Sequence, residues 1–360
     1  MSFRYIGSKA RVVAQIAEHM GLPKGRFFVD AFCGTGAVAE IAAELGWRVR
    51  LNDHLLAATT MAKARLLSEE ETPFKRLGGY QSAIHTLNQA VPRKGFIWRE
   101  YSPASAKWIG FERRYFTTEN AACVDGIRFQ IQEWRTKRLI NENENFLLIG
   151  DLLSAVNRVA NTAGTYGCFL AKGTPQAGEP ISLRARKLKP RCPAIEVSNT
   201  DASEIIVDAD DLVYLDPPYT KRQYASYYHI LETVALGDSP VVGGVAGLRP
   251  WKDLASDYCY KIRALKTLCM LVAKIPARRM LLSYSNEGHV DLNDLMAGLD
   301  QIGGVKMHEL ASVGRYRPNL QASAARSSVK EFLIVIEKPA VRKMKVTARK
   351  TKVKRRFAPA

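Results

Sequence analysis

A glycine-bearing turn between two short β-rich runs constrains the fold of this chain more than any other feature. Residues 26–31 (RFFVDA) predict a strand, and the turn that follows reads DAFCGTG over residues 30–36. Apolar residues at helical spacing then predict a helix that ends at Gly46. Residues 47–51 predict a second strand, with Asp53 just after it. This succession of strand, glycine turn, helix, strand and acid is half of a doubly wound nucleotide-binding sheet.

A second run, DLVYL at residues 211–215, has no polar alternation inside it and predicts a buried parallel strand. The tetrad Asp216-Pro217-Pro218-Tyr219 follows directly, at the carboxyl end of this strand, where open α/β sheets bind their ligands. We expect further strands at 280–284 and 332–337, and helices at 8–20, 118–135, 227–236, 257–272 and 291–301. The predicted fold class is therefore α/β, with a doubly wound, mostly parallel sheet of the Rossmann-like type.

The middle of the chain, residues 69–199, hardly alternates between strand and helix. It is rich in turns, aromatic residues and basic residues, and its clearest element is the helix predicted at 118–135. The simplest organisation is one α/β domain made of residues 1–68 and 200–340. Residues 69–199 are then an inserted, largely helical unit that folds separately, and residues 341–360 are a basic tail that we expect to be flexible.

The charge of the chain points to a polyanionic partner. Its net charge is +18, and residues 341–356 contain nine lysines and arginines and no acid, so the rest still carries +9. A basic body with a basic tail suits nucleic acid. A solubilising surface charge explains the tail as well, but it explains the body less well.

Composition argues against several other classes of protein. The apolar runs are too short to cross a bilayer, and residues 1–9 do not resemble a signal peptide, so we expect a cytoplasmic protein. The six cysteines include no Cys-x-x-Cys pair, and no histidine cluster accompanies them. This spacing argues against a metal site or a disulfide framework and favours free thiols.

The glycine turn has the chemistry of a cofactor site. Glycines let the backbone pass close to a ligand, and Asp53 can accept hydrogen bonds from both hydroxyls of a ribose. The third glycine of the dinucleotide fingerprint is missing, which argues against NAD and a hydride-transfer enzyme. Asp30 suits a cationic amino group better than a pyrophosphate, and this favours S-adenosylmethionine as the cofactor.

The tetrad has the chemistry needed to methylate the N6 amine of adenine. That amine is a poor nucleophile because its lone pair is delocalised into the ring. The carboxylate of Asp216 and the carbonyl of Pro217 can accept its two hydrogens, and Pro218 helps to fix the direction of that carbonyl. Tyr219 offers a flat face on which an extruded base can stack. The structural alternative is a rigid turn with an exposed tyrosine.

With these two motifs the chain resembles the alpha group of adenine-N6 DNA methyltransferases, the Dam-like and FokI-type class, over most of residues 3–338. The resemblance includes YIGSK at residues 5–9, DAFCGTG, DPPY, and flanking segments such as LSYSNEG at 282–288. It implies a Rossmann-like fold, S-adenosylmethionine as cofactor, and site-specific methylation of a flipped-out adenine in duplex DNA. A restriction-modification system, a phage and housekeeping methylation are all open as the setting of this reaction. It also implies a monomer.

The resemblance assigns roles to individual residues. Asp216, Pro217, Pro218 and Tyr219 would be catalytic. Tyr5 and Lys9 would contact the cofactor, and Asp201 would meet its adenine. The full set of expected cofactor-binding residues is Tyr5, Lys9, Asp30, Phe32, Gly34, Gly36, Asp53, Asp201 and Asp216. No metal is expected.

Two basic stretches in the inserted unit, at 93–115 and 172–191, are candidates for reading DNA. In the first, aromatic residues alternate with lysines and arginines. Cations can hold phosphates, arginine can pair with guanine, and an aromatic ring can fill the gap that a flipped base leaves. The alternative is a packed core with a solvated charged face. For the whole chain, methylation of structured RNA remains the main alternative, and a non-catalytic nucleic-acid-binding protein is a further one.

Overall fold

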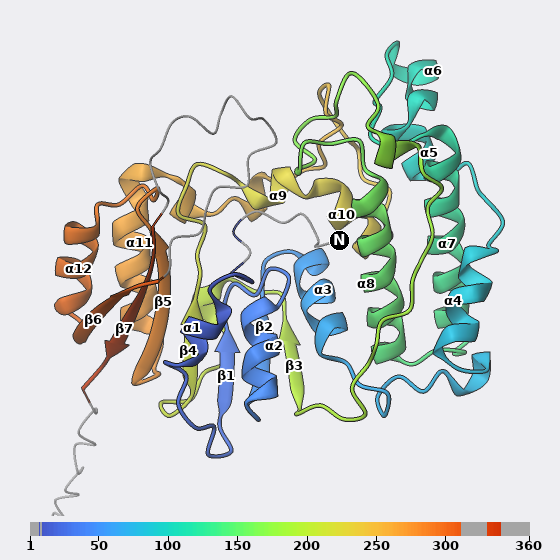
Figure 1. The fold of residues 1–360 in the computed structure, drawn as a ribbon. Helices are drawn as coiled ribbons and strands as arrows, with labels where there is room; N and C mark the ends of the chain where they lie inside the picture. The colour runs from blue at the N-terminus through green and yellow to red at the C-terminus, as the bar shows by residue number, and fades with distance from the viewer. Residues whose placement is uncertain (1–6, 8, 311–329, 340–360) are drawn as a thin grey trace, which may run out of the picture.

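A seven-stranded sheet with strand order β3-β2-β1-β4-β5-β7-β6 forms the centre of the protein (Figure 1). The computed structural model describes residues 7, 9–310 and 330–339. Strands β3, β2, β1, β4 and β5 are parallel, whereas β7 pairs antiparallel with both β5 and β6. The strands are β1 Phe27–Asp30, β2 Arg48–Asn52, β3 Ile195–Ser198, β4 Leu212–Leu215, β5 Arg279–Ser285, β6 Gly304–Glu309 and β7 Glu331–Glu337.

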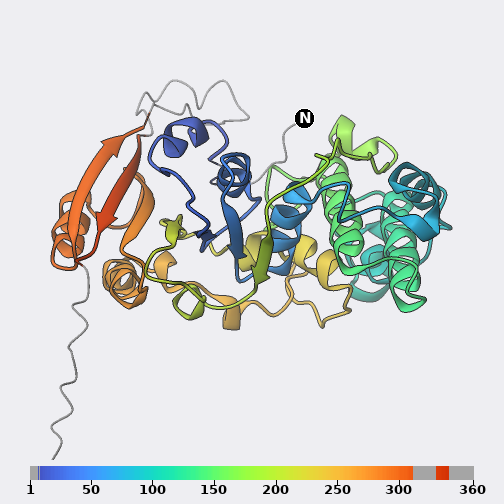
Figure 2. The same cartoon turned by 90° about the horizontal axis from the view of Figure 1, so that it is seen from below.

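Helices cover both faces of this sheet because successive side chains of its buried strands point to opposite sides. Phe28 and Tyr214 pack against α1 (Val13–Ala17) and α2 (Ala37–Glu44). Val29 and Val213 pack against α11 (Lys261–Lys274) and α12 (Leu292–Asp300). Figure 2 shows α1 and α2 on one face of the sheet and α11 on the other. The predicted doubly wound α/β fold is confirmed.

The helical region lies beside the sheet, at the right of Figure 1. Its helices are α4 Tyr80–Asn88, α5 Phe96–Tyr101, α6 Ala106–Ile109, α7 Thr118–Thr136 and α8 Glu142–Val159. Helix α7 matches the helix that its apolar spacing predicted, and the side chain of Thr117 caps its start.

This region is not the separate unit that we expected. A single hydrophobic core runs from its helices into α3 (Leu56–Leu66) and α10 (His229–Leu236) of the α/β part. The contact is close where α3 meets α8, because a Cβ built on Gly150 would lie 2.4 Å from the Cβ of Ala64. The insertion is thus joined by continuous packing to helices α3 and α10 of the α/β part.

Two strands, β3 and β6, were not predicted. Strand β3 lies inside the range 69–199, and it pairs with β2 at the edge of the sheet. Both are edge strands with partly exposed side chains, so neither has the apolar run that identified β1 and β4. The helix expected at 8–20 is shorter than expected, with regular turns only at Val13–Ala17. Ser8, its expected cap, lies outside the described residues, as does the tail at 341–360.

Two of the remaining helical segments lie close to the cavity described below. These are α9 (Tyr224–Tyr227) and the short 3-10 turn Asp257–Cys259, which precedes α11. Among the residues that the structure describes, no helix is both long and apolar enough to span a membrane.

Candidate active site

A cavity of about 1040 Å³ opens at the carboxyl ends of β1, β2 and β4. Asp30 is the last residue of β1, Asn52 the last of β2, and Asp216 follows β4 directly. All three line the cavity. Since parallel strands end at the same edge of the sheet, the fold brings together groups that are up to 186 residues apart in the sequence.

Lys9 lies at the centre of a buried polar network in this cavity. Its ammonium is 3.1 Å from Asp216 Oδ1 and 3.2 Å from Glu331 Oε2. It also donates a hydrogen bond to the hydroxyl of Tyr219 at 3.3 Å, and that hydroxyl donates to Glu331 Oε1 at 3.3 Å. The network joins the N-terminal motif, the tetrad and strand β7. Glu331 has no counterpart in the motifs that the sequence offered.

The charges of this network depend on one another. Burial alone would lower the pKa of Lys9, but Asp216 and other neighbours raise it well above its usual range, so the ammonium stays charged. Burial raises the pKa of Asp216 to about 6, against the opposing effect of Lys9. Glu331 adds to this rise by its negative charge. Asp216 is therefore ionised at neutral pH and accepts hydrogen bonds.

Asp30 is a buried carboxylate with an unused hydrogen-bond acceptor. Its exposed fraction is 1%, and Oδ1 has no hydrogen-bond partner among the described residues. Burial, followed by the charges of Asp216 and Asp53, raises its pKa well above the usual range. An unpaired acceptor in such a place favours a ligand that brings a donor or a positive charge.

Asp53 is held at the end of β2 by backbone donors. Its Oδ2 accepts from the N–H of Gly34 at 3.1 Å, and its Oδ1 accepts from the N–H of Leu55 at 3.0 Å. A carboxylate has about four acceptor positions, and the backbone N–H of His54 also donates to Asp53, so about one position remains for a ligand. Burial raises the pKa of Asp53, and these hydrogen bonds oppose the rise.

Asp201 and Phe32 also line the cavity. Asp201 accepts from the N–H of Ser203 at 2.8 Å and lies 3.5 Å from Nε2 of His54. Burial alone would raise the pKa of Asp201, but these partners lower it. The ring of Phe32 meets that of Tyr258 edge to face at 5.5 Å. Tyr258 lines the cavity too, and no motif had pointed to it.

The two glycines of the turn differ in their surroundings. Gly34 lines the cavity with a φ of +48°. Gly36 is not among the lining residues, and a Cβ on it would lie 2.8 Å from the backbone of Ala62 in α3. Gly36 therefore allows α2 to pack closely on α3. Tyr5 lies outside the described residues.

The tetrad presents its residues in different ways. Asp216 and Pro218 line the cavity, whereas Pro217 is buried. The ring of Tyr219 lies 5.4 Å from that of Tyr284, and the Lys9 ammonium is 5.1 Å from its centroid. Tyr219 is not among the residues that line the cavity. Stacking of the target base on its ring therefore stays a prediction.

This donor set fits S-adenosylmethionine better than a phosphate-bearing cofactor. The free acceptor of Asp30 suits an ammonium, Asp53 has an acceptor position left for a ribose hydroxyl, and the cavity is large enough for the whole molecule. A pyrophosphate would meet three carboxylates here, those of Asp30, Asp53 and Asp216.

Comparison with known families agrees with this geometry. The profile of the D12 class N6 adenine-specific DNA methyltransferases matches residues 5–294, which include the glycine turn, Asp53, Asp201 and the tetrad. The chain belongs to this family.

Curated relatives of this D12-class chain are restriction-modification methyltransferases. The type II methyltransferase M.NlaIII of Neisseria lactamica is 31% identical over 313 residues, which are 83% of this chain and 88% of the relative. M.FokI of Planomicrobium okeanokoites is 31% identical over 344 residues, 93% of this chain. The modification methylase StsI of Streptococcus sanguinis is 32% identical over 301 residues, 81% of this chain. The chain spans about half the length of the last two, 52% and 45%.

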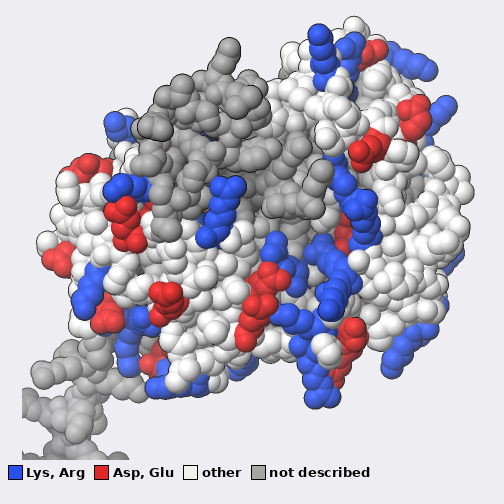
Figure 3. Space-filling view, viewed as in Figure 1, with Lys and Arg blue, Asp and Glu red and all other residues white. Residues whose placement is uncertain are grey.

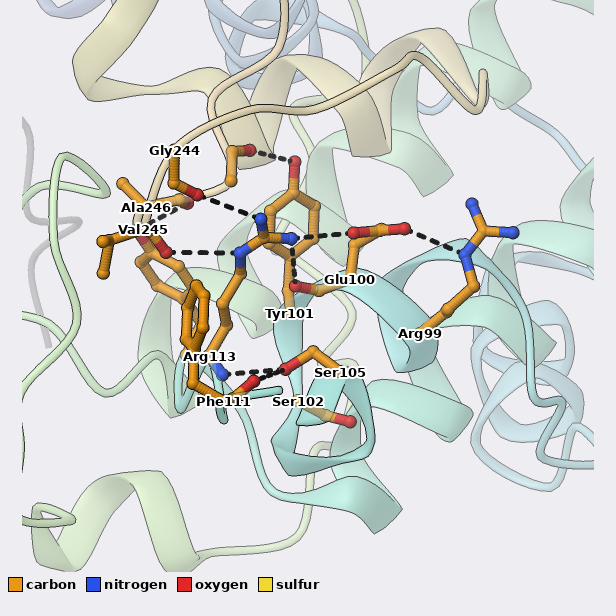
Figure 4. Close-up of polar contacts among 12 residues, drawn as sticks. Arg99, Glu100, Tyr101, Ser102, Ser105, Phe111, Arg113, Gly244, Val245 and Ala246 are labelled. Atoms are coloured by element: carbon orange, nitrogen blue, oxygen red, sulfur yellow. Dashed lines mark hydrogen bonds and ion pairs between the residues drawn. The ribbon is translucent and has the colours of Figure 1, made fainter. Parts of the chain in front are cut away.

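The first basic stretch of this D12-class chain is partly structural. Arg113 is 2% exposed, and its guanidinium lies 2.7 Å from Glu100 Oε2. It also donates to the carbonyls of Gly244 and Val245, at 3.0 and 3.2 Å (Figure 4). Arg113 therefore holds a loop and is not available to DNA, so the packed-core interpretation is right for this residue.

The second basic stretch also pairs with acids. Arg186 lies 2.5 Å from the buried Asp151, and Lys189 lies 2.6 Å from Glu44. Arg186 is 26% exposed and is held by the buried Asp151, whereas Lys189 and Glu44 form an exposed ion pair at the surface. Direct base reading by this stretch stays a prediction.

Exposed basic and aromatic side chains of the first stretch gather at α6. Lys107 and Arg114 are exposed, and Trp108 is 55% exposed. Figure 3 shows basic side chains projecting at the top of the helical region with acidic side chains beside them, and the two kinds are also mixed over the lower part of the same face. At this tip around α6, Lys107 and Trp108 are exposed, whereas Arg114 pairs with Glu112 at 2.7 Å and donates to the carbonyl of Ala171 at 3.1 Å.

Proposed function

We propose that this D12-class chain transfers a methyl group from S-adenosylmethionine to the N6 amine of an adenine held out of duplex DNA. One observation carries the proposal. Asp216, which is ionised and held by Lys9, and the buried Asp30 line the same cavity. The Oδ1 atom of Asp30 has no hydrogen-bond partner among the described residues. Asp216 suits the target amine and Asp30 a cationic cofactor.

The residues divide into two sets around the cavity. Asp30 would hold the ammonium of the cofactor, Asp53 its ribose hydroxyls, and Asp201 its adenine. S-adenosylmethionine supplies an electrophilic methyl group when bound. The backbone at Gly34 can approach it closely, because this residue has no side chain.

Asp216 and Pro217 would act on the target base. The carboxylate of Asp216 accepts one hydrogen of the amine and the carbonyl of Pro217 accepts the other, which directs the lone pair of nitrogen towards the methyl group. Holding the two reactants in this way can contribute on the order of 7 kcal/mol to rate acceleration. With a pKa of about 6, Asp216 can also take up the proton that the amine loses and release it to water.

We propose that the helical region and the tail hold the DNA. Lys107 and Arg114 at the tip around α6 would contact phosphates, and Trp108 would lie against the bases or the groove. The family and the relatives support a role in a restriction-modification system. The recognition sequence, the monomeric state and the cytoplasmic location stay predictions.

The test is transfer of labelled methyl from S-adenosylmethionine to unmethylated duplex DNA, followed by nucleoside analysis. We expect N6-methyladenine in one sequence context. Asp216→Asn should reduce the rate at least about 100-fold while the melting temperature stays close to that of the wild type, since the Asp216 carboxylate acts on the amine itself. Asp300→Asn, an exposed aspartate at the end of α12, is the control.

The outcomes separate this function from the alternative. If Asp216→Asn keeps most of the activity, Asp216 does not act on the amine. If structured RNA competes better than duplex DNA and takes up the label, the substrate is RNA.

A further inference from the structure

Glu331 contacts the catalytic network but belongs to none of the motifs that identify the family site. It is the first residue of β7, next to the C-terminal end of β5. Its backbone is fixed by the sheet, because it pairs with Ser285 and its carbonyl accepts from the N–H of Leu310 at 2.9 Å. Its side chain is 12% exposed. The sheet therefore delivers a carboxylate to a defined place beside the tetrad.

Both oxygens of this carboxylate are used. Oε2 lies 3.2 Å from the Lys9 ammonium, and Oε1 accepts from the hydroxyl of Tyr219 at 3.3 Å. A lysine ammonium has three donors, and Lys9 directs them at Glu331, Asp216 and Tyr219. Lys9, Tyr219 and Glu331 are thus each held by at least two partners, and Asp216 is held by Lys9.

The position of Glu331 decides how Lys9 meets Asp216. The ammonium contacts Oδ1 of Asp216, and Glu331 draws it from the side of β7. Without this second anion, Lys9 would be free to turn fully onto Asp216 and to cover the oxygen that the target amine needs. Tyr219 would also lose the acceptor of its hydroxyl proton.

Building on the proposed function, we propose that Glu331 is a positioning residue for methyl transfer. It holds the Lys9 ammonium and the Tyr219 hydroxyl in place, so that Asp216 keeps one oxygen turned towards the target amine. It does so through two side chains and does not itself touch the reacting atoms.

The charge of Glu331 should affect a measurable quantity, the pKa of Asp216. The Glu331 carboxylate lies close enough to raise the pKa of Asp216. Removing that charge should lower the pKa of Asp216, so the pH at which activity falls on the acid side should also move down. The titratable groups that surround Asp216 are Lys9, Asp30, Tyr214, Tyr219, Tyr224 and Glu331.

The test compares Glu331→Gln with Glu331→Asp. Glu331→Gln keeps the shape and removes the charge, whereas Glu331→Asp keeps the charge and draws it back by one methylene. We expect each to lower kcat between about tenfold and 100-fold, as small displacements of reacting groups do. The acid limb of the kcat profile should move to lower pH in Glu331→Gln and move less in Glu331→Asp. Glu337→Gln, on the same strand and 72% exposed, should match the wild type.

A second measurement does not depend on methyl transfer. Titration of the Asp216 carboxyl carbon by NMR in the protein without cofactor should show a lower pKa in Glu331→Gln than in the wild type. If the titration shifts but the wild type methylates no DNA, Glu331 still orders the network and the proposed function fails. If Glu331→Gln folds, keeps the wild-type kcat and leaves the titration unchanged, the positioning role is wrong.

Discussion

Asp30 has a buried carboxylate oxygen, Oδ1, that accepts no hydrogen bond from any group in the described structure. Burying an ionised acid with one oxygen unsatisfied costs stability, and the raised pKa of Asp30 expresses that cost. The unsatisfied Asp30 carboxylate thus lowers the stability of the fold but offers an acceptor to a ligand. Such an exchange of stability for activity is common at binding sites.

Asp30→Asn should therefore stabilise the protein and weaken its cofactor binding. Because the folded state raises the pKa of Asp30, the cost of this acid grows as pH rises above its unfolded value of 3.8. The melting temperature of Asp30→Asn should exceed that of the wild type by a few degrees at pH 8 and by less at pH 5. Scanning calorimetry measures the first effect and titration calorimetry with S-adenosylmethionine the second. A variant that melts lower at pH 8, or binds unchanged, would contradict this interpretation.

The positions of Asp30, Gly34, Asp53 and Asp216 around one cavity could be predicted because each belongs to a motif beside a strand end, and Lys9 was assigned to the site by the resemblance to the family. Glu331 could not be predicted in this way. It precedes the apolar run at 332–336, and a charged residue at the start of a strand is ordinary in sequence. Only the pairing of β7 with β5 brings it to the tetrad. Gly36 shows the converse, since its place in a cofactor motif did not reveal that it accommodates α3.

At the scale of elements, the loop at 244–247 depends on the helical region. Arg113 holds the carbonyls of Gly244 and Val245, and Tyr101 donates to that of Gly247 at 3.0 Å. Tyr115 donates to the carbonyl of Ala246, also at 3.0 Å. Four successive carbonyls are thus bound by three side chains, which orders a glycine-rich loop that has little side-chain packing of its own.

Arg113→Ala should destabilise the protein by about 3–5 kcal/mol, because it leaves Glu100 and the loop carbonyls without their buried partner. Arg114→Ala is the matched control. Its pair with Glu112 is exposed and contributes at most about 1 kcal/mol. Urea unfolding gives both values. Arg114→Ala should instead weaken DNA binding and reduce its salt slope by about 1 if Arg114 contacts a phosphate. Equal stability losses in the two variants would refute this division of roles.

Elements with a strong apolar period were predictable, and edge elements were not. Strands β1 and β4 are buried along their whole length, so their sequences are continuously apolar up to the site. Strand β6 exposes Lys306 and Met307, and its sequence resembles that of a loop. The insertion packs closely on α3 where Gly150 meets Ala64. This contact joins residues far apart in the sequence, so the local spacing of apolar residues could not predict it.

At the scale of the whole molecule, the positive charge is divided between a folded body and the tail. The body keeps +9 without residues 341–356, although many of its cations are paired with acids. The tail has no acid to pair with inside its own sequence. If the chain binds DNA as proposed, we therefore expect the tail to supply contacts that do not depend on base sequence.

A variant that ends at residue 340 should bind random duplex DNA more weakly. For every phosphate that the tail neutralises, its removal should reduce the slope of log affinity against log salt by about 0.9. Fluorescence anisotropy at salt concentrations from roughly 50 to 200 mM measures this slope. A variant with a glycine-serine segment of equal length in place of the tail is the control for chain length. An unchanged slope would assign the tail another role.

The contact between Lys9 and Glu331 joins residues 322 positions apart in the chain. A ribosome adds about 5–20 residues per second, so roughly 16–64 s separate the synthesis of the two. During that interval the nascent chain already contains Asp216 but lacks the strand that completes the network. The network around Lys9 is therefore completed only after residue 331 has been made and β7 has joined the sheet, so the site that we propose is fully ordered late in synthesis.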